Sequence, residues 1–439
     1  MSVTGREIEV VASDEDASVA LSPEDRAILA LESPTIAGHT CKVVHLTGSS
    51  PTVAQLRERV AERIHLAPAL RRRLAQDARG TPVWRADPTF DVTNHVVSHH
   101  HDDPVDRAGL RRCVARLFEQ RLDRERPLWR IDVVELREDE RALVWRIHHA
   151  LADGTASRRY GRALLWDEAP ERRLTPTQAA AQHAVDDARR RAHLAGYLRR
   201  ELARSHGRSP FDGAICERRE VAFAGVSLGP LRRAAKRIDG ASVNDAVLCV
   251  VAGALRHWLW VHHGRLGTIR VKVPVSLHHE GDAVANRDSM FSLGLPLSEA
   301  DPVARLRIIH ARTSRRKAAR DAEEREVLMH RISGVSPRLQ RYAEQLERSP
   351  RRFALNVSNV PGPREPVSVL TSPVIALYSI AEISHHHALR ISVMSLADEL
   401  TFGFCVDPDV IGDVGTIADA IAPEARALEA RALEAAAEA

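Results

Sequence analysis

The sequence is poor in the residues that commonly mark a redox, zinc or nucleic-acid function. Its five cysteines are scattered, with no Cys-x-x-Cys pair and no visible disulfide framework, so reduced thiols are expected and no metal site is predicted. Aromatic residues make up 4% of the chain and the net charge is only +4, without a basic patch interleaved with aromatics, so nucleic-acid binding is not expected. Lysine is also rare: the four are Lys42, Lys236, Lys272 and Lys317, and arginine supplies the remaining positive charge.

Long apolar runs are missing as well. The longest, Ala246 to Leu255, is far shorter than a membrane span. The first 20 residues are polar and acidic and contain no apolar signal core. These absences favour a cytoplasmic protein that spans no membrane, and they leave peripheral contact with lipid open.

The most informative segment is the seven residues from His148 to Gly154, which follow an apolar run of strand type, Ala142 to Ile147. A buried strand that ends in two histidines presents an imidazole to a cavity, and a neutral imidazole takes a proton from an alcohol or amine near pH 7. Asp153 either bonds to the imidazole or pairs with an arginine and holds the loop. Gly154 allows a tight turn and close approach of a substrate. This chemistry points to group transfer.

The spacing alone is weak, because His-x-x-x-Asp occurs four times, at His99, His149, His183 and His278. Only the copy at His149 combines a preceding histidine, a following Gly154 and an apolar strand leading in. The other three lie in charged or turn-rich surroundings typical of solvated surface. We therefore select His149 as the candidate base.

The pattern of the chain predicts two domains joined by a polar crossover. We expect a disordered stretch at 1–20, a first domain at 21–167, an arginine-rich helical crossover at 168–219 and a second domain at 220–439. Helices are predicted at Val53–Val60, Leu110–Phe118 and Asn244–Leu259, the last behind a capping box at Ser242. The tail from Pro423 is predicted to be an exposed helix.

Several segments in one order resemble the bacterial wax ester synthase/acyl-CoA:diacylglycerol acyltransferase family. They carry the family's opening, its Pro-Leu-Trp element, the HHxxxDG signature, the Asn-Asp helix and two elements of the carboxy-terminal half. These segments are Leu21–Asp25, Leu122–Trp129, His148–Gly154, Val243–Arg256, Pro274–Leu277 and Asn356–Pro363. The resemblance extends from about Leu21 to Asp413.

This resemblance implies an α/β fold of two chloramphenicol-acetyltransferase-like sandwich domains with an active-site tunnel between them. His149 would then be the general base that deprotonates the acceptor hydroxyl, and His148 would orient it. Asp153 would fix the loop through a salt bridge. Acyl-CoA would be a co-substrate, with no bound cofactor, and the acceptor would be a long-chain alcohol or diacylglycerol.

Five residues are candidates for substrate binding by the same resemblance. Ser358 and Asn359 either line the tunnel near the acyl carbonyl or belong to a Pro-Gly-Pro turn after a strand. Asn244 has a structural explanation in the capping box, and Trp129 has one in core packing. Ser276 is a candidate oxyanion donor, and Gly154 would adjoin the substrate.

The chain also departs from the family, with three histidines at His385–His387 and a charge in the segment Asn286–Ser289. A more polar tunnel would suit an acceptor other than a long-chain alcohol or diacylglycerol. One alternative is therefore an acyltransferase of specialised metabolism that modifies a polar alcohol or amine from CoA or a carrier protein. A second alternative is a non-catalytic lipid-binding relative. A metal site at the three histidines has no supporting carboxylate pattern.

Overall fold

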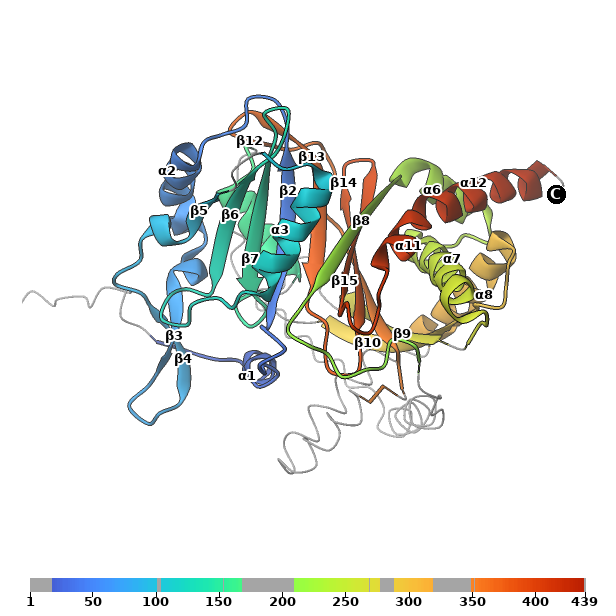
Figure 1. Cartoon of the computed structure of the whole chain (residues 1–439), viewed down its shortest axis with the longest axis horizontal. Coiled ribbons are helices and arrows are strands. Elements are labelled where there is room, and N and C mark those ends of the chain that lie inside the picture. The colour runs from blue at the N-terminus through green and yellow to red at the C-terminus, as the bar shows by residue number, and fades with distance from the viewer. Residues whose placement is uncertain are drawn as a thin grey trace, which may run out of the picture.

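The computed structural model describes residues 18–100, 104–152, 154–167, 209–267, 269–276, 288–318, 349–350 and 352–437. Asp153, most of the predicted crossover and most of the amino-terminal stretch predicted to be disordered lie outside these residues. Figure 1 shows two sheet-rich units side by side, which confirms the expected α/β class.

The first six-stranded sheet combines strands from both halves of the sequence. Its order is β12 (Ser368–Val369), β13 (Ser372–Ala381), β2 (His39–Leu46), β7 (Arg141–His148), β6 (Trp129–Glu135) and β5 (Val96–His99). The pairs are antiparallel except for β5 with β6, which is parallel. A separate three-stranded sheet has the order β1 (Val19–Ala20), β4 (Pro82–Ala86) and β3 (Arg72–Gln76).

The second six-stranded sheet comes only from the second half. Its order is β10 (Asp288–Leu295), β9 (Ile269–Ser276), β11 (Leu355–Val360), β14 (Leu389–Leu396), β15 (Glu399–Val406) and β8 (Glu220–Ser227). Strand β11 is parallel to both of its neighbours. The predicted domain division did not anticipate that β12 and β13 leave this half and pair with the first sheet; the boundaries themselves remain a prediction.

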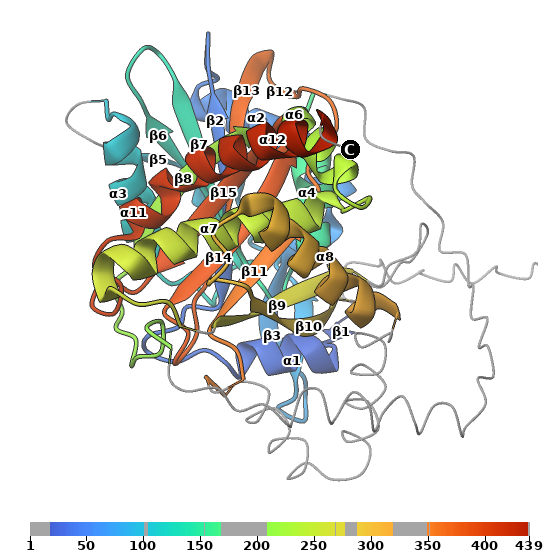
Figure 2. The ribbon, with the colours of Figure 1, turned by 90° about the vertical axis from the view of Figure 1, so that its right-hand side faces the viewer.

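Helices pack against the sheets in both units. The first unit has α1 (Pro23–Leu29), α2 (Val53–Arg63), α3 (Arg107–Glu119) and α4 (Gly154–Leu164), and the second has α6 (Leu228–Arg237), α7 (Val243–His263), α8 (Pro302–Ala318), α11 (Val414–Asp419) and α12 (Ile421–Ala437). Figure 2 shows α7, α8 and α12 across the outer face of the second sheet. No helix within the described ranges has the length and apolar character needed to cross a membrane.

Local sequence explains where several of these helices begin and end. The capping box predicted at Ser242 is present, with Asp245 as its partner, and α7 ends at Gly264 in the left-handed conformation at φ +60°. The helix predicted from Val53 is confirmed as α2, behind a second capping box at Thr52. The strand predicted before the histidines is confirmed as β7, and every residue after its first is buried.

Two predictions about exposure and boundaries are wrong. The carboxy-terminal tail is a helix, but it is not exposed all round: Leu428 and Ala432 are fully buried against the helical layer. The alternative that placed Ser358 and Asn359 in a turn after a strand is also wrong, because β11 extends to Val360 and contains both residues. In both cases long-range packing, which the local pattern does not contain, determines the outcome.

A continuous core joins the two units. Helix α3 packs against β8 of the second sheet, between β7 and β8 in Figure 1. Gly403 of β15 makes a second close contact, because a Cβ atom there would lie 2.1 Å from the carbonyl oxygen of Ser379 on β13. Strands β13 and β15 are therefore in direct backbone contact at this point.

Candidate active site

The histidine loop leaves the end of β7 and reaches α4 within six residues. The His149 amide donates to the Gly38 carbonyl at 2.9 Å, and the His148 amide donates to the Leu128 carbonyl at 2.9 Å. The amides of Leu151 and Ala152 both donate to the His148 carbonyl, at 2.9 and 3.1 Å. The loop is thus held by its own turn and by two neighbouring segments.

The imidazole of His149 is half-buried and has no normal hydrogen bond to a described residue. Burial, and after it the positive charge of Arg390, lower the pKa of His149 to about 4, while the residue's own main chain works in the opposite direction. The ring is therefore neutral at pH 7. A neutral imidazole without a protein partner is suited to accept a proton from a substrate.

His148 is fixed, by contrast, through both of its ring nitrogens. The Ala150 amide donates to its Nδ1 at 3.1 Å, which leaves the proton on Nε2. That Nε2 donates to Glu32 Oε1 at 3.1 Å. Gly38 makes room for this pair, because it has φ +77° and a Cβ there would lie 2.6 Å from His148 Nε2. His148 is 3% exposed, whereas Glu32 is only partly buried.

Glu32 connects His148 to two arginines. Arg124 donates to Glu32 at 2.6 Å and Arg121 at 3.2 Å. Burial alone would raise the pKa of Glu32, but its hydrogen bonds and charge interactions with His148 and Arg124 outweigh burial and lower it. The carboxylate is therefore charged at pH 7. Sequence reasoning missed Glu32, and its separation from His148 along the chain leaves no local signal that would have found it.

A second buried ion pair, between Arg219 and Glu382, fastens the segment before β2 to the second half. Arg219 Nε donates to Glu382 Oε1 at 2.9 Å, and the Ala37 amide donates to Glu382 Oε2 at 3.2 Å. Ala37 precedes Gly38, whose carbonyl holds His149. Arg390 donates from Nη1 to the Glu382 carbonyl at 3.2 Å. Glu382 thus helps to position both His149, through the segment Ala37–Gly38, and Arg390.

The predicted substrate-binding residues are not all on one surface. Strand β11 pairs with β14 so that Ser358 lies opposite Ser392, and their hydroxyls are 3.3 Å apart. Side chains alternate along a strand, so Asn359 points to the other face, the one that carries Val357 and the core under α7. The structure favours Ser358 over Asn359 as a residue of the crevice.

Gly154 faces the same strand, since a Cβ atom there would lie 3.2 Å from Val360 of β11. Asn244 is half-buried in the first turn of α7, in the outer helical layer, and the described residues give it no hydrogen bond to the histidine loop. Ser276 ends β9, and its side chain lies outside the described part, as does Asp153. Trp129 is a core residue that donates to the Leu70 carbonyl at 2.7 Å.

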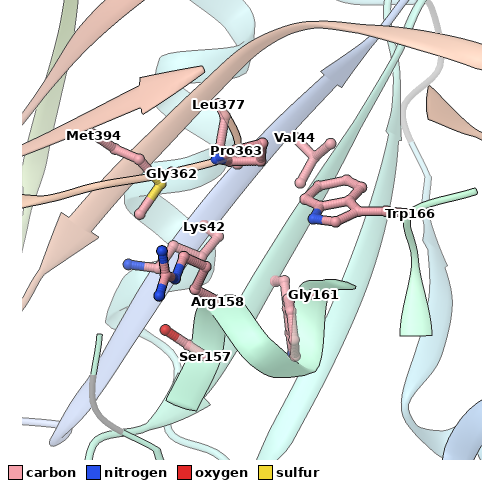
Figure 3. A pocket seen from close by; sticks show the side chains of 11 residues that line it. Lys42, Val44, Ser157, Arg158, Gly161, Trp166, Gly362, Pro363, Leu377 and Met394 are labelled. Carbon is pink, nitrogen blue, oxygen red and sulfur yellow. The ribbon is translucent and has the colours of Figure 1, made fainter. Parts of the chain in front are cut away.

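A small apolar pocket, with a cavity volume of about 20 Å³, adjoins α4 (Figure 3). It is lined by residues of β2, β7, α4, β13 and β14 and of the segments after α4 and β11: Lys42, Val44, Trp145, Ser157, Arg158, Gly161, Trp166, Gly362, Pro363, Leu377 and Met394. Lys42 is 7% exposed. Lys42 is the buried lysine of β2, and its position in a strand is the sequence signal for this pocket.

The three histidines after β13 do not converge on one point. His385 is exposed, His386 bonds through Nδ1 to Asp212 Oδ1 at 2.9 Å, and the His387 ring stacks on Phe353 with centroids 4.0 Å apart. Among the described residues, the group with metal-ligand spacing is instead Cys216, Asp407 and Asp409. Arg218 already neutralises Asp409.

Comparison with known proteins gives a consistent result. The model of the wax ester synthase/diacylglycerol acyltransferase catalytic domain matches residues 21–195, and that of the WS/DGAT C-terminal domain matches residues 284–429. A probable diacylglycerol O-acyltransferase of Mycobacterium tuberculosis is 30% identical over 373 residues, which are 78% of this chain and 80% of that protein. A putative diacylglycerol O-acyltransferase of Mycobacterium bovis matches to the same extent.

The chain belongs to the wax ester synthase/diacylglycerol acyltransferase family. It is therefore an acyltransferase, as the sequence predicted. The wax ester synthase/diacylglycerol acyltransferase of Marinobacter aquaeolei VT8 has the same fold, with a TM-score of 0.69 at 22% identity over 94% of this chain and 99% of that one. The starter condensation domain of rhizomide synthetase, solved in complex with C8-CoA, shares the fold with a TM-score of 0.61 at 14% identity, over 95% of each chain.

Proposed function

We propose that this member of the family transfers a fatty acyl group from acyl-CoA to an alcohol, with His149 as the general base. The observation that carries this proposal is the neutral, half-buried imidazole of His149, which has no hydrogen-bond partner among the side chains that the structure describes. The family relatives named as diacylglycerol O-acyltransferases support the reaction class, and the solved relative with C8-CoA supports a CoA thioester as donor.

The chemistry follows from the ring geometry. Nδ1 is buried next to the residue's own main chain, so Nε2 is the nitrogen left for a substrate. Nε2 accepts the hydroxyl proton as the acceptor oxygen attacks the thioester carbonyl. The tetrahedral oxyanion then collapses, the C–S bond breaks, and the thiolate leaves as the histidine returns the proton. Asp153, His148, Gly154 and Ser358 would position the loop and the substrate around this step.

Release of free CoA from palmitoyl-CoA tests this proposal, with hexadecanol, diacylglycerol and smaller alcohols as acceptors. We expect release that depends on an acceptor and is lost in His149→Ala, whereas the exposed His385→Ala serves as the matched control. Activity that survives His149→Ala would exclude the mechanism. Binding of acyl-CoA without turnover on any acceptor would favour the non-catalytic lipid-binding alternative.

A second candidate is acyl transfer to a polar alcohol or amine, from CoA or a carrier protein. It is supported by the positive charges of Arg390 and Lys42, which both lower the pKa of His149 and therefore lie near the proposed base. The donor is distinguished by comparing palmitoyl-CoA with a palmitoyl carrier protein at equal concentration. Faster transfer from the carrier would favour this candidate over the first.

We also propose that the enzyme works in the cytoplasm in peripheral contact with lipid. Support comes from Trp260 and Val261 at the end of α7, which are 60% and 56% exposed. Sedimentation with phosphatidylglycerol vesicles tests this, and Trp260→Ala should weaken binding. Equal sedimentation of the variant and the parent protein would exclude this contact.

A further inference from the structure

A polar pocket with a cavity volume of about 310 Å³ lies at the β5 edge of the first sheet, apart from the small pocket beside α4. Ligand sites in proteins typically have volumes of about 300–1,000 Å³, so this cavity is large enough for a small molecule. It is bounded by the segment before β5, the segment after α3 and the first residues of β6. The described residues that line it include one acidic side chain, Asp123, and four arginines: Arg121, Arg126, Arg130 and Arg146. The composition of this wall favours an anionic ligand.

The pocket lies at the end of the first sheet that carries the histidine loop. Strand β6 begins where its antiparallel neighbour β7 ends, and β5 runs parallel to β6 from the same end (Figure 1). The Leu128 carbonyl, which accepts from the His148 amide at 2.9 Å, lies between two residues that line the pocket. Arg121 lines the pocket as well, and it donates to Glu32, the partner of His148. The pocket therefore adjoins the loop that carries the proposed base.

Two of the lining arginines, Arg126 and Arg130, use only one of their three nitrogens within the protein. Arg126 Nε donates to Asp123 Oδ2 at 3.2 Å, and Arg130 Nε donates to Asp132 Oδ1 at 2.9 Å. Their terminal nitrogens have no hydrogen bond to a described residue, and the two side chains are 44% and 41% exposed. Each guanidinium therefore keeps a fork of donors that matches two oxygens of one anionic group.

Arg146 adds a fixed positive charge to the wall of the pocket. Its side chain is 2% exposed, and its Nη2 donates to Asp132 Oδ2 at 2.8 Å. Its Nη1 donates to the carbonyls of Leu117 and Gln120, at 2.6 and 2.8 Å. These bonds hold the guanidinium in place before any ligand binds, so its charge attracts an anion without a further cost of ordering the side chain.

The ion pairs around the pocket contain more positive than negative charge. The pairs are Arg126 with Asp123, Arg130 and Arg146 with Asp132, and Arg121 and Arg124 with Glu32. Five arginines against three carboxylates leave a net charge of +2. A phosphate monoester carries a charge of about −1.5 to −2 at pH 7 and would balance this surplus, whereas a carboxylate would balance only half of it.

We infer that this pocket binds the phosphate group of a small phosphate ester, with Arg126 and Arg130 as its direct ligands. The other two lining arginines supply charge. The side-chain amides of Asn94 and Gln120 also line the pocket, bond to no described residue and can contact the rest of the ligand. The phosphate belongs either to acyl-CoA itself or to a separate phosphorylated metabolite, and both sources make the same demand on the two arginines.

Calorimetric titration of the full chain with glycerol 3-phosphate and inorganic pyrophosphate tests this inference, with glycerol as the neutral probe. We expect a phosphate probe to bind and glycerol not to bind. Arg130→Ala should weaken phosphate binding about tenfold, through the loss of charge-assisted hydrogen bonds, and Arg130→Lys should weaken it less. Arg130→Ala leaves Asp132 paired with Arg146, so the buried carboxylate keeps a partner and the variant should fold.

Arg126→Ala should weaken phosphate binding to a similar extent. The matched control is Arg218→Ala, since Arg218 is also exposed and also paired with an aspartate, Asp409, but does not line the pocket. Phosphate binding that is equal in the parent protein, Arg126→Ala and Arg130→Ala would overturn the inference. Absence of binding for every phosphate probe would overturn it as well.

Kinetics with palmitoyl-CoA and palmitoyl-pantetheine, which lacks the phosphates of CoA, identify the source of the phosphate. If it belongs to acyl-CoA, Arg126→Ala and Arg130→Ala should raise KM for palmitoyl-CoA about tenfold and leave KM for palmitoyl-pantetheine unchanged. If it belongs to a separate metabolite, both KM values stay unchanged and only the titration responds. The titration requires no turnover. Phosphate binding without acyl transfer would therefore contradict the proposed function alone, and acyl transfer without phosphate binding would contradict this inference alone.

Discussion

Two turns of this molecule carry adjacent histidines, and their surroundings differ in one respect. In the turn after β13, His386 bonds to Asp212, His387 stacks on Phe353, and His385 is in solvent. In the loop after β7, His148 is bonded through both ring nitrogens, whereas half-buried His149 has no partner among the described residues. The turn after β13 therefore leaves each imidazole bonded, stacked or solvated, and the loop after β7 leaves His149 available.

The difference shows that doubled histidines are not by themselves a chemical signal. A hydrogen-bonded or stacked ring holds structure, but a desolvated ring without a partner keeps a vacant acceptor for a substrate proton. Glu32 bonds to His148 and has no bond to His149. It therefore fixes the loop while the His149 ring stays available. The following predictions contrast the two turns.

The largest effect is expected at the base itself. His149→Ala removes the proton acceptor, so kcat should fall about 100- to 10,000-fold, with little change in KM for palmitoyl-CoA. Steady-state release of CoA measures both constants. A fall of less than tenfold would place the proton acceptor elsewhere.

The next effect concerns the group that positions His148. Glu32→Ala should lower kcat roughly tenfold to a hundredfold, because a small displacement of the loop misplaces His149. Glu32→Gln keeps an acceptor for His148 Nε2 and should restore much of the loss. If Glu32 has only a structural role, both variants will lower thermal stability, and kcat will not fall more than KM changes.

The pH dependence gives an intermediate effect. Since the pKa of His149 is about 4, kcat/KM should be level from pH 8 to pH 5 and then fall about tenfold per pH unit below pH 4. Arg390→Gln removes a positive charge and should move this limb to higher pH. A limb near pH 6.5 in the parent enzyme would show that the His149 ring is solvated and not desolvated.

The free energy of unfolding should also decrease as the pH falls. The pKa of His149 is about 4 and that of His39 about 3, both lowered by burial, so the unfolded chain binds protons more tightly than the folded one. Their contribution to stability is complete above the ordinary histidine pKa of about 6.5 and is lost as the pH falls from there toward 4 and 3. Urea midpoints at pH 8, 6 and 5 measure this trend.

The smallest effect on catalysis is expected in the other turn. His387→Ala removes the stack on Phe353 and should cost about 1–3 kcal/mol of stability while kcat stays unchanged. Urea unfolding and CoA release, measured on the same preparation, separate the two quantities. A loss of activity without loss of stability would assign the triple-histidine turn a role at the site.

Local sequence patterns predicted the helices and strands that carry the site, but not the side-chain pairs that hold its residues in position. Alternation and capping residues identified β7, α2 and α7, and the motif identified His149. Glu32, Arg219 and Arg390 escaped prediction because each acts through a partner that only the tertiary structure brings near. The face assignment of Ser358 and Asn359 likewise depends on the register of β11 against β14.

Strand β13 has a consequence for the order in which the chain is made. Before residue 381 has been synthesised, β2 has no neighbour on one side, although all eight of its residues are buried in the finished protein. When only the first half has emerged from the ribosome, β2 therefore forms an unpaired sheet edge made of residues that are buried in the finished protein. Such an edge is especially prone to pair with another chain. The nascent enzyme needs protection through that interval, and the first half expressed alone should aggregate.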